Sequence, residues 1–298
     1  MKATHRSNPL RTAQRRFLAA WLVPLLACFA LFRVWPLLYG LYISFFDWDV
    51  FSSTHAFRGL TNYVQELRSP LFVTLLANTS YFALASTLVS LVVGYLVAVM
   101  LNNVVRFKSF FRTLFYLPNM TSMIAVSIVW MWLYQPQFGL FNAILRSLGL
   151  PVLSWLKSPD TAMPSIIVMS VWCSVGYPII VILAGLQSIP RELYEAATVD
   201  GATGRRIFTS ITFPLMRPVT LFVTVTGFMN GFQVFQQIYV MTQGGPLNST
   251  AVFAYRIFQL GFSQLKFGRA ASLAFIVFGL VLALTIAQLR LGRTTTWY

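Results

Sequence analysis

The sequence predicts an all-α polytopic membrane protein that crosses the bilayer with six transmembrane helices and keeps both termini in the cytoplasm. Three observations lead to this prediction: the composition, six long apolar stretches and the distribution of basic residues. Of the 298 residues, 57% are hydrophobic and only 10% are charged, whereas soluble domains carry roughly 25% charged residues. Together with a mean hydropathy of +0.69, this composition excludes an ordinary soluble enzyme and a disordered chain.

Six stretches are long enough to cross a membrane, because a spanning helix needs about 20 predominantly apolar residues. They cover Phe17–Tyr39, Phe72–Leu101, Phe111–Tyr134, Met163–Leu186, Val219–Met241 and Ala270–Leu289. Several prolines lie in or at the ends of these helices, namely Pro24, Pro36, Pro118 and Pro178. Kinks at such prolines persist in a bilayer only where neighbouring helices or a cavity satisfy the freed carbonyls. The spans are therefore expected to form a bundle with an interior.

The 22 basic residues indicate the orientation, since cytoplasmic loops carry an excess of lysine and arginine. With six spans both termini share one side, and 14 basic residues fall on that side against eight on the other. One dense cluster comprises Arg106, Lys108 and Arg112. We therefore expect a cytoplasmic tail at 1–16, a transmembrane domain at 17–290 and a second cytoplasmic tail at 291–298. The net charge of +15 is then mainly an orientation signal, and no nucleic acid partner is expected.

The seven acidic residues are more informative about mechanism, because none lies inside a predicted span. Three of them, Glu192, Glu195 and Asp200, lie within nine residues of one loop on the side of the termini. Proton relays and ion-coupled transporters commonly use carboxylates or histidines inside the membrane. His5 and His55 also lie outside the spans. This distribution argues against transport driven by ion coupling.

The chain also lacks the sequence patterns of an enzyme. The sequence has no carboxylate pair at a buried position for acid–base chemistry, no zinc-type His/Cys cluster and no G-x-x-x-x-G-K-[ST] phosphate loop. We expect no catalytic residue, no bound metal and no cofactor. If the bundle moves a solute uphill, the energy has to come from another polypeptide.

The loop at residues 187–215 has the composition of a structured element. Pro190 suits the first position of a helix, and Glu192 and Glu195 favour the positive end of the helix dipole. Two alanines follow, which leave a small surface for close packing, and Gly201 can end the helix in a left-handed conformation.

A second short helix is expected at about Arg205–Phe213, after a bend permitted by Gly204. Two interpretations of the whole loop remain open at this point. It is either a surface helix held on lipid headgroups by its arginines, or a docking element for a partner.

Several motifs match one known family. In the loop they are Ile189-Pro190-x-Glu192-Leu193, Glu195-Ala196-Ala197, Asp200-Gly201-Ala202 and Ile211-Thr212-Phe213-Pro214. Elsewhere they are Gly59-Leu-Thr-Asn-Tyr, Phe111-Arg-Thr-Leu-Phe-Tyr-Leu-Pro118 and Thr242-Gln-Gly-Gly-Pro-Leu-Asn-Ser-Thr250. The loop resembles the EAA loop of ABC importer permeases, and the flanking motifs resemble the carbohydrate-uptake branch of maltose and glycerol-phosphate type. The similarity covers about residues 17–290; Phe213 departs from it, since the family usually has leucine there.

The resemblance implies that this loop forms a coupling helix inserted into a cleft on a cytoplasmic ATPase. By analogy, Glu195 makes the main polar contact with the ATPase, and Gly201 supplies the turn. The neighbouring alanines would allow close approach, and Ile211 and Pro214 would hold the loop against the bundle. The coupling residues implied in this way are Glu192, Glu195, Ala196, Ala197, Asp200, Gly201, Ile211 and Pro214.

The resemblance also implies an assembly in the cytoplasmic membrane of a bacterium or archaeon. The chain is expected to be a permease subunit of a binding-protein-dependent ABC importer, forming half of the pathway for a carbohydrate or a glycerol-phosphate-like solute. A second related permease, two copies of a cytoplasmic ABC ATPase and an extracytoplasmic solute-binding protein would complete the transporter, with ATP hydrolysis on the ATPase. The alternative is an ATP-independent secondary transporter or channel subunit.

The fifth span is unusually polar for its depth. Four of its polar residues recur at i, i+4, i+7 and i+11, the spacing of one helical face. They are Thr226, Asn230, Gln233 and Gln237. Gln236 is expected to point elsewhere, and Ser174 and Tyr177 beside Pro178 are further candidates for a pathway. The stripe must face protein or water, and it is either interhelical hydrogen bonding or a pathway wall whose amides bind sugar hydroxyls.

Overall fold

The computed structural model describes residues 9–49, 55–103 and 107–293. Within these ranges the chain is almost entirely helical, and the only extended pairings are two isolated bridges. The prediction of an all-α fold is confirmed. Residues 1–8 and 294–298 of the two predicted tails lie outside the described residues, as does Arg106 of the basic cluster.

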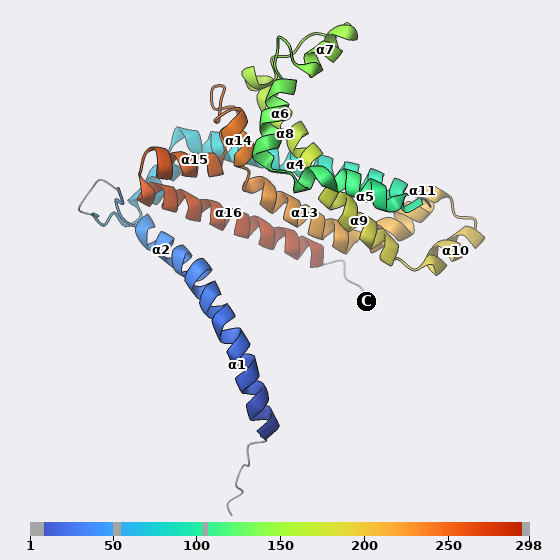
Figure 1. The fold of residues 1–298 in the computed structure, drawn as a ribbon, viewed down its shortest axis with the longest axis horizontal. Helices are drawn as coiled ribbons and strands as arrows, with labels where there is room; N and C mark the ends of the chain where they lie inside the picture. The colour runs from blue at the N-terminus through green and yellow to red at the C-terminus, as the bar shows by residue number, and fades with distance from the viewer. Residues whose placement is uncertain (1–8, 50–54, 104–106, 294–298) are drawn as a thin grey trace, which may run out of the picture.

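Three long helices lie side by side and form the body of the molecule (Figure 1). They are α4 (Pro70–Asn103), α13 (Arg217–Phe232) and α16 (Phe267–Arg293). A short helix, α14 (Gln236–Met241), follows α13 after a break. Counted by length and apolar composition, four stretches could each cross a membrane. They are Ala20–Ser44, Pro70–Asn103, Arg217–Met241 and Phe267–Arg290.

The third and fourth predicted spans are bent helix pairs. In the third, α5 (Lys108–Tyr116) and η2 (Leu117–Met120) meet α6 (Met123–Leu133) at 93°. In the fourth, α8 (Pro159–Ser174) meets α9 (Gly176–Ser188) at 48°. The described residues therefore contain four to six candidate spans, and the count of six requires each bent pair to be one span. Both bends lie next to a proline that the sequence had marked as a site of kinking.

Small residues allow α4 and α13 to approach closely. A Cβ atom added at Gly231 would lie 2.6 Å from Ala83 Cα, and one added at Gly227 would lie 3.0 Å from Thr87 Cγ2. The two glycines form a G-x-x-x-G pattern, which in membrane helices marks a close helix contact. This contact was not predicted from the sequence, although the spacing of the glycines carries its signal.

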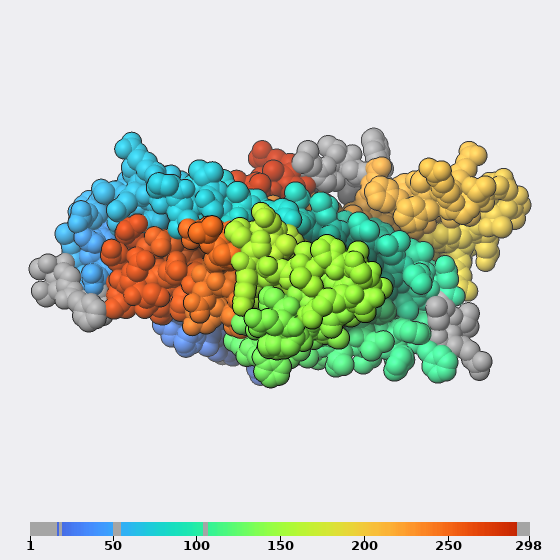
Figure 2. All heavy atoms as spheres, turned by 90° about the horizontal axis from the view of Figure 1, so that it is seen from above, coloured from blue at the N-terminus to red at the C-terminus, as the bar shows by residue number. Residues whose placement is uncertain are grey.

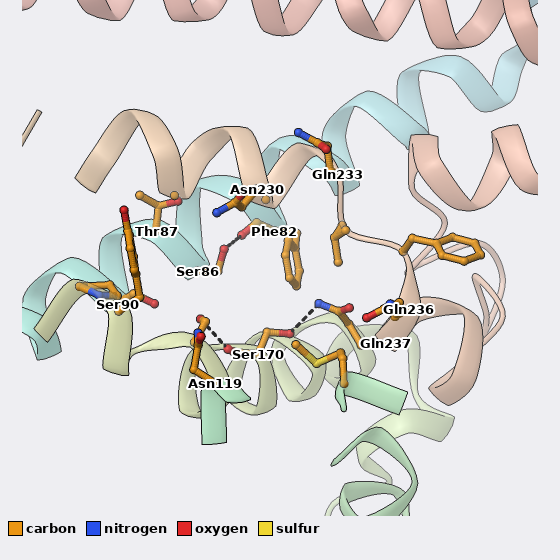
Figure 3. Close-up of a pocket in the computed structure, with 18 of the residues that line it drawn as sticks. Phe82, Ser86, Thr87, Ser90, Asn119, Ser170, Asn230, Gln233, Gln236 and Gln237 are labelled. Carbon is orange, nitrogen blue, oxygen red and sulfur yellow. Dashed lines mark hydrogen bonds between the residues drawn. The ribbon is translucent and has the colours of Figure 1, made fainter. Parts of the chain in front are cut away.

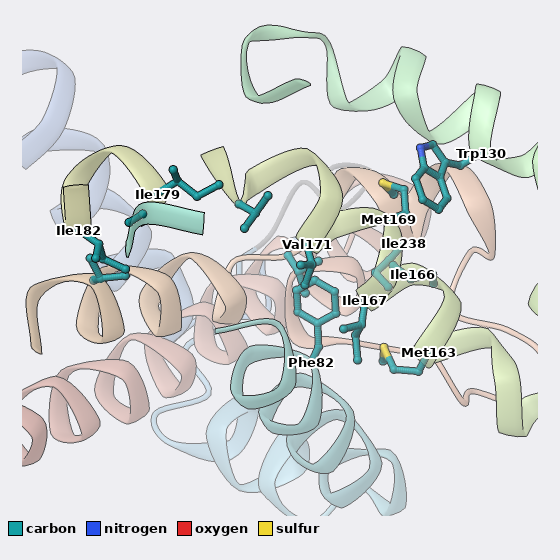
Figure 4. Packing of buried hydrophobic residues seen from close by; sticks show 14 of the residues in the cluster. Phe82, Trp130, Met163, Ile166, Ile167, Met169, Val171, Ile179, Ile182 and Ile238 are labelled. Carbon is teal, nitrogen blue, oxygen red and sulfur yellow. The ribbon is translucent and has the colours of Figure 1, made fainter. Parts of the chain in front are cut away.

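The buried apolar core joins α4, α8, α9 and α14 (Figure 4). Phe82 of α4, Ile166 of α8, Ile182 of α9 and Ile238 of α14 are each 3% exposed or less. Because these residues come from helices far apart in the sequence, the core fixes the arrangement of the helices around the cavity described below.

The N-terminal helices extend away from this body (Figure 1). They are α1 (Pro9–Phe29), a π-helical turn η1 (Ala30–Val34) and α2 (Trp35–Ser44). Contacts with the body are made by α2, which packs on α16. The most apolar window of Ala20–Ser44 buries none of its residues inside this chain. This helix therefore depends on lipid or another chain to cover its apolar surface.

The connection between α6 and α8 projects from the body and carries α7 (Leu140–Ser147) at its tip (Figure 1). Viewed from above, it forms a knob on the face that Figure 2 shows. Asn142 organises it: its Nδ2 donates to the carbonyls of Pro136 and Leu153, and its Oδ1 accepts from Trp155 Nε1. A single buried side chain thus ties together three parts of the projection.

A buried ion pair joins α16 to the short helix α3 (Thr61–Leu67). The Arg269 guanidinium donates to Glu66 Oε1, with Nε at 2.7 Å and Nη2 at 2.5 Å, and the Glu66 side chain is only 4% exposed. Asn62 of the same helix donates to the carbonyls of Ser44 and Phe46. These contacts hold the end of α2 against the start of α16.

Candidate functional site

A cavity of about 570 Å³ lies inside the helical body and is called the polar pocket here (Figure 3). Its walls come from α4, η2, α6, α8, α9, α13 and α14. Its polar lining residues are Ser86, Thr87, Ser90, Asn119, Ser170, Ser174, Tyr177, Asn230, Gln233, Gln236 and Gln237. Its volume lies within the roughly 300–1,000 Å³ of small-molecule sites.

Three helix breaks meet at the polar pocket. Asn119 lies just before the break between η2 and α6, and Ser174 and Tyr177 flank the break between α8 and α9. Gln233 and Phe235 lie in the break between α13 and α14. Non-helical backbone at membrane depth is tolerated where it lines a cavity. The position of the three breaks around a cavity is therefore the one in which broken helices are tolerated in a membrane.

The predicted polar stripe is wrong in one respect, because the fifth span is not one continuous helix. The structure ends α13 at Phe232, and Phe235 has φ −140° and ψ −59°. The chain thus turns between Gln233 and Gln236, and a helical face cannot be extended through it. Asn230, on the last turn of α13, and Gln233, just after its end, line the polar pocket directly, and Gln237 lines it from α14, after the turn.

As a result, the prediction is wrong for Thr226 and for Gln236. Thr226 is not among the lining residues of the polar pocket, and its hydroxyl donates to the carbonyl of Phe222 at 2.8 Å. Gln236, which was expected to point elsewhere, lines the polar pocket (Figure 3). Ser174 and Tyr177 line it as predicted. Gln237 lines the polar pocket and also makes the interhelical hydrogen bond that one interpretation of the stripe predicts, from its Nε2 to Ser170 Oγ.

The hydrogen bonds in the polar pocket engage the serine protons (Figure 3). Ser86 donates to the carbonyl of Phe82, Ser170 to that of Ile166 and Ser174 to that of Ser170, at 2.6–2.7 Å. Gln237 Nε2 in turn donates to Ser170 Oγ at 3.2 Å. Because the helix backbone uses the hydroxyl protons of Ser86, Ser170 and Ser174, these three oxygens present lone pairs to the cavity.

Several lining residues were not predicted from the sequence. Ser86 and Ser90 lie one turn apart on α4, and Asn119 follows Pro118. The signal for the two serines was their spacing of four within an apolar run, which places them on one helical face. Asn119 had no comparable signal, since it reaches the polar pocket only because the chain bends by 93° beside it.

The 187–215 segment forms a second candidate site and lies far from the projection (Figure 2, yellow). Its first helix, α10 (Arg191–Val199), begins directly after Pro190, which is the N-cap residue and not the first helical one. Gly201 has φ +72° and follows the helix end at Asp200. The predicted left-handed helix end is therefore confirmed, and it favours glycine because a Cβ is strained in that conformation.

Most of the candidate coupling residues in and just after α10 face solvent. Glu192, Glu195, Ala196, Asp200 and Gly201 are exposed, whereas Ala197 is half-buried. No hydrogen bond or ion pair holds the three carboxylates within the described parts of the chain. These groups are therefore free to meet a partner.

The second helix of the segment is longer than predicted. It runs through α11 (Gly204–Ile207), a π-helical turn η4 (Phe208–Thr212) and α12 (Phe213–Leu215), and Thr203 Oγ1 caps it by accepting from the Arg206 backbone N–H. Tyr194 and Thr212 hydroxyls are 3.2 Å apart and link it to α10. Ile211 and Pro214 are half-buried.

A cavity of about 650 Å³, called the inner cavity here, lies between this segment and the ends of α4 and α5. Its lining includes two cationic residues, Lys108 and Arg191, and three side-chain amides. Lys108 Nζ donates to the carbonyl of Asn102 at 3.0 Å. These two cavities differ in charge, since the described lining of the polar pocket contains no charged residue.

Broken helices around a polar cavity inside a bundle of apolar helices are typical of membrane transport proteins. The family model for the inner membrane component of binding-protein-dependent transport systems matches residues 90–296. The chain belongs to this family.

Two relatives and two solved structures agree with this assignment. The chain is 34% identical to the probable ABC transporter permease YurN of Bacillus subtilis, over 92% of this chain and 95% of that protein. It is 32% identical to the trehalose/maltose transport permease MalF of Thermococcus litoralis, over 91% and 92%. A bacterial ABC transporter that imports the acidic polysaccharide alginate matches with a TM-score of 0.84 and 26% identity, covering 97% of this chain and 100% of that one. A bacterial alginate ABC transporter with an alginate pentasaccharide-bound periplasmic protein matches with a TM-score of 0.83 and 25% identity, over 95% and 96%.

Proposed function

We propose that this chain forms one half of the translocation pathway of a binding-protein-dependent ABC importer for a carbohydrate. The polar pocket is the observation that carries the proposal, because amides and hydroxyls line a cavity inside apolar helices. Side-chain amides both donate and accept, as sugar hydroxyls do. The relatives named for trehalose and maltose and for alginate support a saccharide as the solute.

A second, related permease supplies the other half of the pathway in this proposal. Asn230, Gln233 and Gln236 line the polar pocket but remain exposed in the single chain. Exposed amides at the depth of apolar helices are costly in lipid. A second permease that covers them would complete the walls of the pathway.

We further propose six spans with both termini in the cytoplasm of a bacterium or archaeon. Each bent pair then counts as one span, and the resulting total of six places both termini on the same side of the membrane. The excess of basic residues on the side of the termini supports the orientation. In this arrangement the 187–215 segment and the inner cavity face the cytoplasm.

Coupling to a pair of cytoplasmic ABC ATPase subunits is assigned to the 187–215 segment. The exposed carboxylate of Glu195 makes the main polar contact, and Ala196 and Ala197 let the ATPase approach closely. Gly201 redirects the chain, and Ile211 and Pro214 transmit the motion to the body. Glu192 and Asp200 flank the contact on the same exposed surface. Alternating access follows when the two ATPase subunits close on ATP and move this segment, while an extracytoplasmic binding protein delivers the solute.

The test compares two glycines three positions apart. A Cβ at either Gly201 or Gly204 meets nothing within 4 Å, and of these two glycines only Gly201 has a positive φ. Gly201→Asp is expected to abolish ATP-dependent uptake of labelled maltose or trehalose while the protein still reaches the membrane. Gly204→Asp adds the same charge without the backbone strain and is expected to retain most uptake.

The readouts are sugar uptake, membrane content and co-purification of the ATPase. Normal uptake and normal ATPase association in Gly201→Asp would refute the coupling role. Uptake that persists after ATP depletion would instead favour the secondary transporter or channel.

A further inference from the structure

The polar pocket differs from the inner cavity because no charged residue is found in its described lining. Its described lining contains five side-chain amides and six side-chain hydroxyls. It contains no aspartate, glutamate, lysine, arginine or histidine. The inner cavity, by comparison, has Lys108 and Arg191 in its wall. An anion that leaves water for a cavity between apolar helices needs a positive partner. None is present on the part of the polar pocket that this chain supplies.

The serine oxygens sharpen this contrast. The hydroxyl protons of Ser86, Ser170 and Ser174 are donated to backbone carbonyls, and Ser170 Oγ also accepts from Gln237. Further bonds to these oxygens therefore have to come from donors on the solute. A sugar hydroxyl can donate, whereas a carboxylate or a phosphate dianion can only accept. The serine oxygens therefore favour solutes with hydroxyl groups and disfavour carboxylates and phosphates.

We propose that the polar pocket selects uncharged polyhydroxylated solutes and rejects solutes that carry a phosphate or carboxylate group. This proposal rests on the function proposed above, in which the polar pocket lies on the pathway. It narrows the expected solutes, because it removes glycerol-phosphate-like compounds and acidic sugars. The amides at Asn119, Asn230 and Gln236 supply N–H donors and carbonyl acceptors to a neutral solute, and the serine oxygens supply the acceptors that discriminate.

The test measures how a charged and an uncharged thiol reagent reach the polar pocket. In a Cys28→Ser background, which removes the exposed native thiol and keeps the buried Cys173, Gln236→Cys places a thiol in the lining. Leu247→Cys is the control position, since Leu247 is 88% exposed and is not among the lining residues. The assembled transporter in membrane vesicles is treated with 2-hydroxyethyl or 2-sulfonatoethyl methanethiosulfonate, which differ mainly in charge.

The expected result is a ratio of anionic to neutral modification rates at position 236 that is about tenfold lower than at position 247. Adding Asn230→Lys is expected to raise the ratio at position 236 towards the control value, because it supplies the missing positive partner. Equal ratios at positions 236 and 247 would overturn the proposal. If Gln236→Cys fails to reach the membrane, Gln233→Cys tests the same wall.

A second readout separates this proposal from the one on which it rests. Modification of Gln236→Cys by the neutral reagent is expected to block ATP-dependent sugar uptake, because the added group fills the pathway. If uptake persists after complete modification, the pathway assignment is wrong whatever the rate ratio. If uptake is blocked but both reagents react equally well, the pathway assignment stands and the charge selectivity is wrong.

Discussion

The polar pocket and the 187–215 segment are built in opposite ways. The walls of the polar pocket come from residues between Phe82 and Gln237, so distant helices have to pack correctly before it exists. The segment is contiguous and largely exposed, and the Tyr194 and Thr212 hydroxyls link its two helices to each other. The polar pocket is uncharged in its described lining, whereas the segment carries Glu192, Glu195 and Asp200 together with three arginines.

The polar pocket therefore depends on packing between helices, whereas the segment depends on contact with a partner. Substitutions around the polar pocket act on helix packing, so they change the stability of the whole chain as well as transport. Substitutions on the exposed surface of the segment act on a partner contact and leave the stability of the chain unchanged. Three predictions test whether this division holds.

The largest effect is expected at Glu195, where the change should affect association alone. Glu195→Gln keeps the size of the side chain and removes its charge, so a charge-assisted bond worth about 1.5–3 kcal/mol is weakened. Binding of the ATPase to the purified permease, measured by titration, should weaken about 10-fold or more. The melting temperature in detergent should not change. Asp160→Asn, the same change on an exposed acid of α8, is the control, and equal losses in both variants would contradict the division.

A smaller effect on stability is expected at the contact between α4 and α13. Gly231→Ala places a Cβ 2.6 Å from Ala83 Cα, and such overpacking costs about 1–3 kcal/mol. The melting temperature and the uptake rate should fall together, because the same contact positions Asn230. Gly279→Ala on α16, where a Cβ meets nothing within 4 Å, should leave both unchanged. A Gly231→Ala protein that keeps its melting temperature but lacks uptake would show that this contact affects transport without affecting stability.

The smallest effect is expected from single amides of the polar pocket. Asn230→Ala and Gln233→Ala each remove hydrogen bonds worth about 0.5–1.5 kcal/mol, which corresponds to a change of about 2- to 13-fold in the KM for sugar uptake. Thr226→Ala is the matched control, since Thr226 lies on α13 but is not among the lining residues. If Thr226→Ala changes KM as much as Asn230→Ala does, the polar pocket is not the solute site.

Features that depend on local sequence could be predicted. Apolar runs predicted the candidate spans, because transfer into a bilayer depends on the hydrophobicity of consecutive residues. Gly201 predicted the end of α10, because glycine adopts the left-handed conformation there without strain. Pro118 and Pro178 marked two of the helix breaks. The third break, between α13 and α14, contains no proline or glycine between Gln233 and Phe235. This break was therefore not predicted, and neither was the position of Gln236 in the lining of the polar pocket.

Features that depend on contacts between distant helices could not be predicted. The wall formed by Ser86 and Ser90 faces Ser170 and Gln237 only after α4 and α8 have packed. Nothing in either stretch alone specifies that pairing. The positions of Thr226 and Gln236 were mispredicted for a similar reason. The predicted face assumed one continuous helix, whereas the folded chain breaks that helix between α13 and α14.

The pair formed by Glu66 and Arg269 has a consequence for the biosynthesis of the chain. Its partners are 203 positions apart, so at about 5–20 residues per second the arginine leaves the ribosome roughly 10–40 s after the glutamate. During that interval the carboxylate has to stay in water, because a lone buried charge is strongly disfavoured. The ends of α2 and α3 therefore reach their final places only after α16 has been translated. A chain truncated before Arg269 would keep this corner open and exposed to proteases that remove incomplete membrane proteins.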